Sequence, residues 1–349
     1  GADLSDTILT GVDLSGMDLT KTILKRADLT NANLTGVDLT DMDLSGTILG
    51  GVDLSGKDLT GTILTGADLS DTNLTGVDLS DRDLTGTILS GMDLSGKDLT
   101  GTKLRGADLT NVNFTGTILT GADLSLSNLA GADLSGMDLT GTKLRAANLT
   151  GVNLDGTILT GTNLSNSILT DVDLSGVDLS GTILTGADLS NTNLTGVDLS
   201  NRDLTGTILS GMDLSGKDLT GIKLRGADLT NVNFTGAILT GADLSLSNLA
   251  GADLTGVDLS GTILREADLS NTNLIGVDLS NTILTSVNLS DKDLTGTILI
   301  GTNLSYANLA GVDLSGTDLT GAIFSHASFA DANLENTNLT GASFVDVDL

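Results

Sequence analysis

The sequence contains no cysteine, proline or tryptophan, and aromatic residues make up only 2% of its 349 residues. The absence of cysteine excludes a disulfide framework, a thiolate metal site and a cysteine nucleophile. The absence of proline suits a backbone whose hydrogen-bonded ladders run without interruption. Apolar residues never run for more than a few positions, so neither a membrane span nor a signal-peptide core is predicted, and we expect a cytoplasmic location.

Basic residues are also scarce, because 16 Lys and Arg face 45 Asp and Glu and give a net charge of −29. A potential of this sign repels nucleic acid and attracts basic protein surfaces, which favours a protein partner over direct nucleic-acid binding. His326 is the only histidine and Tyr306 the only tyrosine, and the sequence identifies no base or nucleophile partner for either. We therefore expect no enzyme activity, and no metal or cofactor site is predicted.

A five-residue word fills the chain, as in the three copies GADLS NTNLT GVDLS at residues 186–200. Every fifth residue from Leu4 to Leu349, here called position i, is Leu or Phe. Position i+2 is mostly Gly, Asn or Asp, which make tight turns cheaply, so a turn recurs in every word and a helix is excluded. On the extended backbone between turns, i−2 and i lie on one side, which is apolar and must face inward.

The word Ala-Asp-Leu-Ser, seen at residues 2–5 and 187–190, and its many variants resemble the pentapeptide-repeat proteins over the entire chain. The resemblance implies an all-β fold, a right-handed quadrilateral β-helix. A β-solenoid of this kind has about 20 residues per coil and here about 17 to 18 coils. We call its four sides first to fourth, beginning with the words centred on Leu4, Leu9, Leu14 and Leu19.

We expect one solenoid domain over residues 1–349, because a solenoid adds coils without adding domains. Residues 66–134 and 186–254 are near-identical copies, which indicates an internal duplication in register. Both ends of the sequence finish in register. Both end coils are therefore predicted to offer unpaired strand edges, through which copies could associate end to end.

The acidic residues are unevenly distributed among the four sides. On the third side, position i−1 alternates between Asp and Asn from Asp13 to Asp293, which relieves repulsion between neighbouring carboxylates. Most basic residues fall on the first side, whereas the third and fourth sides are strongly acidic. The candidate interaction surface is represented by Asp173, Asp178, Asp213, Asp218, Asp253 and Asp258.

Several long side chains occupy the inward position i−2, where a small residue is expected. The cations are Lys57, Arg82, Lys97, Arg202, Lys217 and Lys292, and the methionines are Met17, Met42, Met92, Met137 and Met212. Burying an unpaired ammonium is too costly, so we expect the cationic stems to leave through a widened corner and expose their charge. Methionine can instead fill irregular space.

The sequence favours a non-enzymatic structural or interaction scaffold, a stiff acidic solenoid that presents a protein-binding surface. The alternative follows from the resemblance, since quinolone-resistance members of the family mimic DNA and occupy the DNA-binding saddle of gyrase. This chain lacks the projecting loops that those members carry. A third interpretation, ice binding, is suggested by a threonine column that includes Thr20, Thr40, Thr60 and Thr100.

Overall fold

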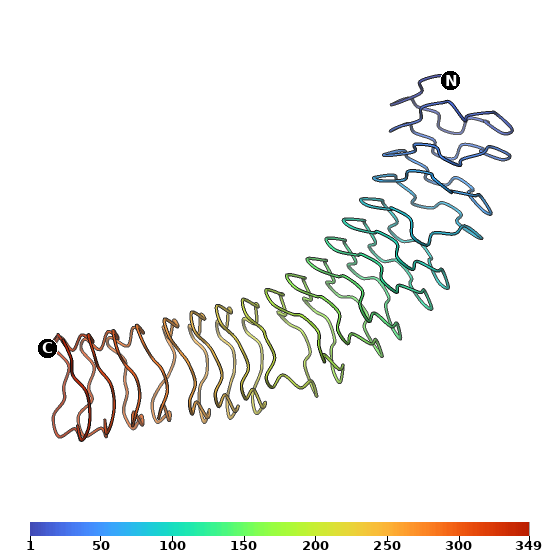
Figure 1. Ribbon diagram of the computed structural model, residues 1–349. Helices are drawn as coiled ribbons and strands as arrows, with labels where there is room; N and C mark the ends of the chain where they lie inside the picture. Colours follow the sequence, from blue (N-terminus) through green and yellow to red (C-terminus); the bar gives the residue numbers. More distant parts are fainter. Residues whose placement is uncertain (349) are drawn as a thin grey trace. The chain divides into compact units, whose positions relative to one another are not determined.

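The computed structural model describes residues 1–348, so the predicted inward position of Leu349 lies outside the described residues. This part of the chain contains no helix, and its strands are reduced to single bridging residues at position i−1, such as Asp3, Ile8 and Asp13. Each bridge is parallel and joins residues 20 positions apart, as between Ile8 and Asp28. The chain is a right-handed quadrilateral β-helix, as predicted, and successive coils follow the colour scale in Figure 1.

Each corner of the coil is a four-residue turn that begins at the central leucine. In the first word the N–H of Thr7 donates to the carbonyl of Leu4 at 3.3 Å, and Asp6 adopts a φ of 58°. A positive φ at the third residue is the feature that type II turns require, which explains the preference for Gly, Asn and Asp. The corner also accepts larger residues, because Leu126 adopts a φ of 63° with its side chain exposed.

Between corners, up to three backbone hydrogen bonds join a word to the corresponding word of the next coil. On the second side Asp28 N donates to Thr7 O at 2.8 Å, Leu9 N donates to Asp28 O at 2.7 Å, and Gly11 N donates to Thr30 O at 2.8 Å. An uninterrupted junction therefore pairs the carbonyl at i−2 with the N–H at i−1 of the following coil.

The core is a stack of central residues. All central Leu and Phe residues from Leu14 to Phe329 are buried, which confirms the predicted register. Threonines at i−2 share this interior, and their hydroxyls donate to leucine carbonyls, as Thr47 does to Leu44 at 2.7 Å. The inward threonines are thus hydrogen-bonded, so their burial leaves no hydroxyl without a partner.

The chain divides into two compact units, and each is described here by itself. The first comprises Gly1–Ile183 and Thr192–Val197, and the second comprises Leu184–Asn191 and Asp198–Leu349.

Long side chains at i−2 interrupt the backbone ladder within both units. Met, Lys or Arg occupies i−2 at several contacts between successive coils of the same unit. At each of these contacts, within residues 1–348, no bridge joins the i−1 residue that follows the long side chain to the i−1 residue 20 positions earlier. We call these junctions seams. They lie at Met42, Lys57, Arg82, Met92, Lys97, Met137, Lys217 and Lys292. Small residues at i−2 allow bridging at other junctions, as Thr102 does for Asp83 and Lys103, but bridges are also missing at some junctions with valine, such as those at Val52 and Val172. A long side chain at i−2 therefore accompanies a missing bridge without being required for one.

Candidate acidic interaction surface

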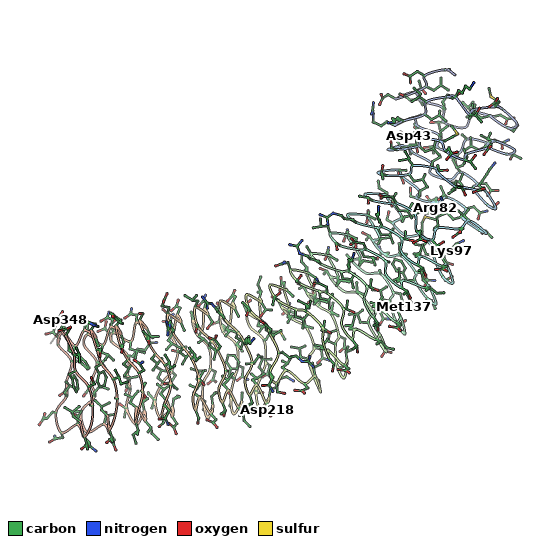
Figure 2. The ribbon with its side chains drawn as sticks, in the orientation of Figure 1. Asp43, Arg82, Lys97, Met137, Asp218 and Asp348 are labelled. Carbon is green, nitrogen blue, oxygen red and sulfur yellow. The ribbon has the colours of Figure 1, made fainter. Side chains whose placement is uncertain are left out.

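The word positions each aspartate at i−1 by a local hydrogen bond. Asp218 accepts the N–H of Thr220 at 3.0 Å and its hydroxyl at 2.6 Å, both on Oδ1. The side chains at i−1 point away from the coil, as Asp218 does in Figure 2. The hydroxyl of Thr220, followed by its N–H, lowers the pKa of Asp218. The carboxylate is therefore ionised at neutral pH.

The third side adds a bond that the sequence did not reveal. Asn233 Nδ2 donates to Asp213 Oδ1 at 3.0 Å, and Asn113 Nδ2 donates to Asp93 Oδ1 at 3.1 Å. The alternation of Asp and Asn therefore does more than separate like charges, since the amide of one coil binds the carboxylate of the coil before it. An amide carries both a donor and an acceptor, which is the sequence signal that could have predicted this bond.

The first side neutralises its own carboxylates. Lys103 Nζ lies 3.3 Å from Asp83 Oδ2 in the first unit, and Lys223 Nζ lies 3.9 Å from Asp203 Oδ2 in the second. These pairs are exposed, so each contributes little to stability, but they reduce the field above this side.

The six predicted surface carboxylates are all exposed, but they belong to different units. Asp173 and Asp178 lie in the first unit, and the other four lie in the second. Within the second unit, Asp213, Asp218, Asp253 and Asp258 are four of the exposed acids on the third and fourth sides. Hydroxyl and backbone hydrogen bonds within their own words lower the pKa of each of these four. We call these four carboxylates the acidic face.

Several of the inward cations make hydrogen bonds that the sequence did not reveal. All six are half-buried, and Lys57, Arg82, Lys97 and Lys292 donate to backbone carbonyls of the preceding coil. Lys57 Nζ donates to Val37 O at 2.7 Å, and Lys292 Nζ donates to Thr272 O at 3.1 Å. Both acceptors are the i−2 carbonyls that a backbone N–H would use in an uninterrupted junction. The ammonium groups of these lysines thus bind carbonyls of the preceding coil, while both residues remain half-buried, so their accessibility to solvent stays a prediction.

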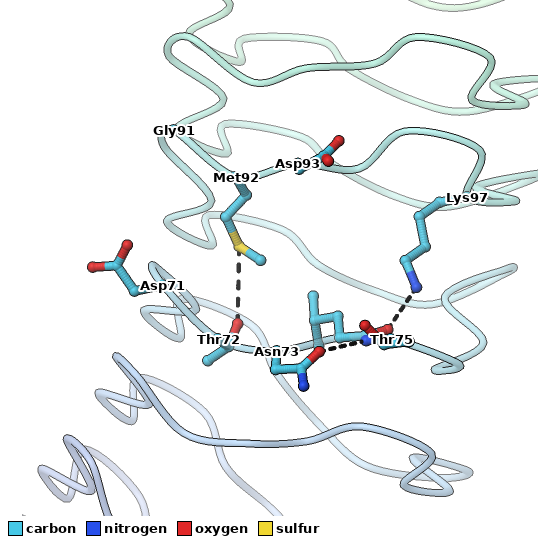
Figure 3. Close-up of a pocket in the computed structure, with 9 residues that line it drawn as sticks. Asp71, Thr72, Asn73, Thr75, Gly91, Met92, Asp93 and Lys97 are labelled. Carbon is cyan, nitrogen blue, oxygen red and sulfur yellow. Dashed lines mark hydrogen bonds between the residues drawn. The ribbon is translucent and has the colours of Figure 1, made fainter.

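Arg82 and Lys97 show the same behaviour. Arg82 Nη1 donates to Leu59 O at 2.8 Å, while its buried Nε has no hydrogen-bond partner among residues 1–348. Lys97 Nζ donates to Leu74 O at 2.5 Å. Figure 3 shows Lys97 and Met92 reaching from one coil toward the preceding coil. The space between them is a cavity of about 350 Å³ at two adjoining seams.

The only tyrosine and the only histidine of the sequence lie together at one corner of the second unit. The rings of Tyr306 and His326 stack with centroids 4.8 Å apart, and His326 Nδ1 lies 3.9 Å from Asp346 Oδ2. The sequence identified no partner for His326, although all three residues occupy i+2 of the first side in successive coils. The spacing of 20 was the signal that could have linked them.

Other chemical arrangements are absent from the described residues. Within residues 1–348 no group of three or more His, Cys, Asp or Glu is placed to hold a metal ion. No helical segment of this part of the chain has the length and apolar character that a bilayer span requires. The hydroxyls of the threonine column act locally, since those of Thr20, Thr40 and Thr60 donate to the aspartates two positions before them.

Comparison with known families gives one match that extends along the chain. The family model described as pentapeptide repeats (8 copies) matches residues 1–26, 18–51, 43–81, 83–116, 107–145, 147–186, 182–221, 213–251, 252–291, 288–325 and 324–349. No match to a curated protein sequence was found.

Solved structures of pentapeptide repeat proteins also match. HetL, involved in heterocyst differentiation regulation in the cyanobacterium Nostoc sp. strain PCC 7120, is 28% identical, with 67% of this chain and 90% of HetL covered and a TM-score of 0.25. Rfr23 from the cyanobacterium Cyanothece 51142 is 31% identical, with 36% and 89% covered and a TM-score of 0.17. QnrB1, a plasmid-mediated fluoroquinolone resistance protein, is 18% identical, with 73% and 91% covered and a TM-score of 0.22.

Proposed function

The chain belongs to the pentapeptide-repeat family, and from that premise we propose that it is a non-enzymatic scaffold whose acidic face binds a basic protein surface. One observation carries this proposal. The carboxylates of the acidic face are exposed and ionised, while Asp203 on the first side of the same unit faces Lys223. A field that is concentrated on some sides only can orient a basic partner as well as attract it.

The backbone supports this role because each carboxylate is held before a partner arrives. Asp213 is fixed by bonds from Ser215 N and Asn233 Nδ2, so little side-chain freedom is lost on binding. Rigid, preoriented groups bind more tightly than mobile ones for the same contacts.

The experiment compares two sets of four Asp→Asn changes in the second unit. The test set is Asp213, Asp218, Asp253 and Asp258, and the control set is Asp203, Asp228, Asp243 and Asp268. Affinity for the basic partner isolated from the source organism should fall about tenfold or more with the test set and much less with the control set. Both sets keep the local bond, since Asn33 already accepts the N–H of Thr35 at 3.0 Å.

Salt provides the second arm of this measurement. Binding should weaken steeply as salt rises, because exposed charges are screened over about 8 Å at physiological ionic strength. Equal losses from the two sets, or an affinity indifferent to salt, would show that the acidic face is not a recognition surface.

The alternative function is a DNA-mimicking inhibitor or protector of a DNA-binding enzyme such as gyrase. It is favoured by one feature of the first unit, where the fourth side carries aspartate at i−1 in five successive coils. These are Asp18, Asp38, Asp58, Asp78 and Asp98. An uninterrupted row of negative charges has the sign and regularity of a nucleic-acid backbone.

A gyrase supercoiling assay distinguishes the two functions. The scaffold proposal predicts no change in supercoiling at micromolar protein. Inhibition that disappears when Asp38, Asp58 and Asp78 are changed to Asn would favour the DNA mimic instead.

A further inference from the structure

One slot occurs twice in the first unit, at positions 80 residues apart in the chain. The first copy is the cavity beside Lys97 in Figure 3, and we call it the Lys97 slot. The second copy, of about 270 Å³, is lined by the corresponding segment 152–156 and by Asp173, Ser175 and Val177. We call it the Val177 slot. In both copies the coils part, since neither Asn73 and Asp93 nor Asn153 and Asp173 are bridged.

The chain itself shows which chemical group this kind of slot accepts. In the Lys97 slot the ammonium of Lys97 donates to Leu74 O at 2.5 Å. At the same position two coils earlier, the ammonium of Lys57 donates to Leu34 O at 2.8 Å and to Val37 O at 2.7 Å. A slot beside the i−2 residue of the fourth side thus binds a primary ammonium through backbone carbonyls, which need no particular side chain.

The Val177 slot has the same frame but no ammonium of its own. Val177 replaces the lysine, and Leu154, the counterpart of Leu74, lines the slot. Asp155 stands where the Lys97 slot has Thr75, and both residues make the same bond, from their N–H to the asparagine two positions before. The replacement therefore adds a carboxylate without changing the local backbone.

The two slots also differ in the charge of their lining residues. The Val177 slot has two exposed carboxylates at its rim, Asp155 and Asp173, and no cation among its lining residues. Asp173 accepts the N–H of Ser175 at 2.8 Å on Oδ1, which orients its carboxylate. A carbonyl with two nearby carboxylates matches the three donors of an alkylammonium.

We infer that the Val177 slot binds a primary alkylammonium supplied from outside, namely the side chain of a lysine on the basic partner. The inference deepens the proposed function and rests on it for the source of the lysine. The amine takes the place that Lys97 fills in the other copy, and Val177 leaves room for its alkyl chain.

The test uses n-butylammonium chloride as a lysine side-chain probe, titrated into the full chain and followed by amide NMR shifts. Saturable shifts at Leu154, Asp155 and Asp173 are expected. Tetramethylammonium chloride is the control, because it carries the same charge but cannot donate a hydrogen bond. Shifts that are equal for the two salts, or that never saturate, would overturn the inference.

Matched variants identify the slot. Val177→Lys supplies the ammonium internally and should weaken probe binding at least tenfold, and Lys57 and Lys97 show that lysine is accommodated at this position. Asp155→Thr should weaken binding about two- to fivefold. The double variant Lys97→Val with Thr75→Asp should create a second set of shifts at Leu74. Unchanged binding in Val177→Lys would refute the site.

This experiment is independent of any partner. If the probe binds but the partner's affinity does not depend on the acidic face, the proposed function is refuted and the Val177 slot is supported. If the probe does not bind but the test set of Asp→Asn changes weakens partner binding, only the Val177 slot is refuted.

Discussion

Changing Leu189 to Asp is expected to unfold the coils around it and to cost about 3 to 5 kcal/mol. Leu189 is fully buried, and its N–H donates to Ile208 O at 2.9 Å. The substitution removes a buried apolar side chain and places a carboxylate in the apolar core, so both effects destabilise the fold. Because coils of a solenoid contact only their neighbours, the loss should be local at first.

The matched control is Ile208→Asp, which introduces the same residue on the same side one coil later. Ile208 is 37% exposed and points outward, at the position that Asp188 and Asp228 hold in adjacent coils. The melting temperature of Ile208→Asp should fall much less than that of Leu189→Asp, because the added repulsion from Asp188 and Asp228 is screened by solvent. Circular dichroism melting and hydrogen exchange over residues 184–210 measure the difference, and an unchanged melt for Leu189→Asp would show that the assigned register is wrong.

Acid is expected to destabilise the protein, through many small contributions that act together. Asp58, Asp138 and Asp293 are examples of aspartates whose pKa is lowered, first by the hydroxyl and then by the N–H of the residue two positions on. A carboxylate with a lowered folded-state pKa contributes stability above its unfolded pKa and loses it as pH falls through the folded value. The melting temperature should therefore decrease once the pH is lowered below about 4.

Repulsion among carboxylates acts in the opposite direction, since protonation relieves it. Asp38 shows which effect is larger, because its pKa is lowered by the bonds from Thr40 despite the nearby charge of Asp58. The control changes Asp58, Asp138 and Asp293 to Asn, which keeps the N–H bond but does not titrate in this range. This variant should show a flatter melting curve against pH. A melting temperature that rises in acid would mean that repulsion dominates.

Much of the fold could be predicted because each position of the five-residue word has its own residue preference. Leu at i, small residues at i−2 and turn formers at i+2 specify which side chains face inward, and burial from Leu14 to Phe329 confirms this register. The outward aspartates were equally predictable, since i−1 alternates with the inward positions. Handedness and the four sides came from the resemblance to a family, because periodicity alone does not distinguish the ways in which a turning chain can close.

The candidate sites were less predictable, because they depend on residues 20 positions apart. The bond between Asn233 and Asp213, the stack of Tyr306 on His326 and the pair of Lys223 with Asp203 all join successive coils. Sequence reasoning placed these residues on the correct sides. It did not show which atoms meet, since that depends on the rotamers that each neighbour leaves free.

The sequence by itself thus determined the word, the turn at each corner, the inward leucines and the distribution of charge over the four sides. Only the tertiary structure decided where the ladder opens and where the inward lysines place their charge. The physical reason is that a local pattern specifies backbone conformation and facing, whereas a seam depends on how much volume two stacked coils can share. At Lys57 the coils part, and the ammonium then binds Val37 O in place of a backbone N–H. The lysine ammonium and the backbone N–H compete for the same carbonyl only once the coils are stacked.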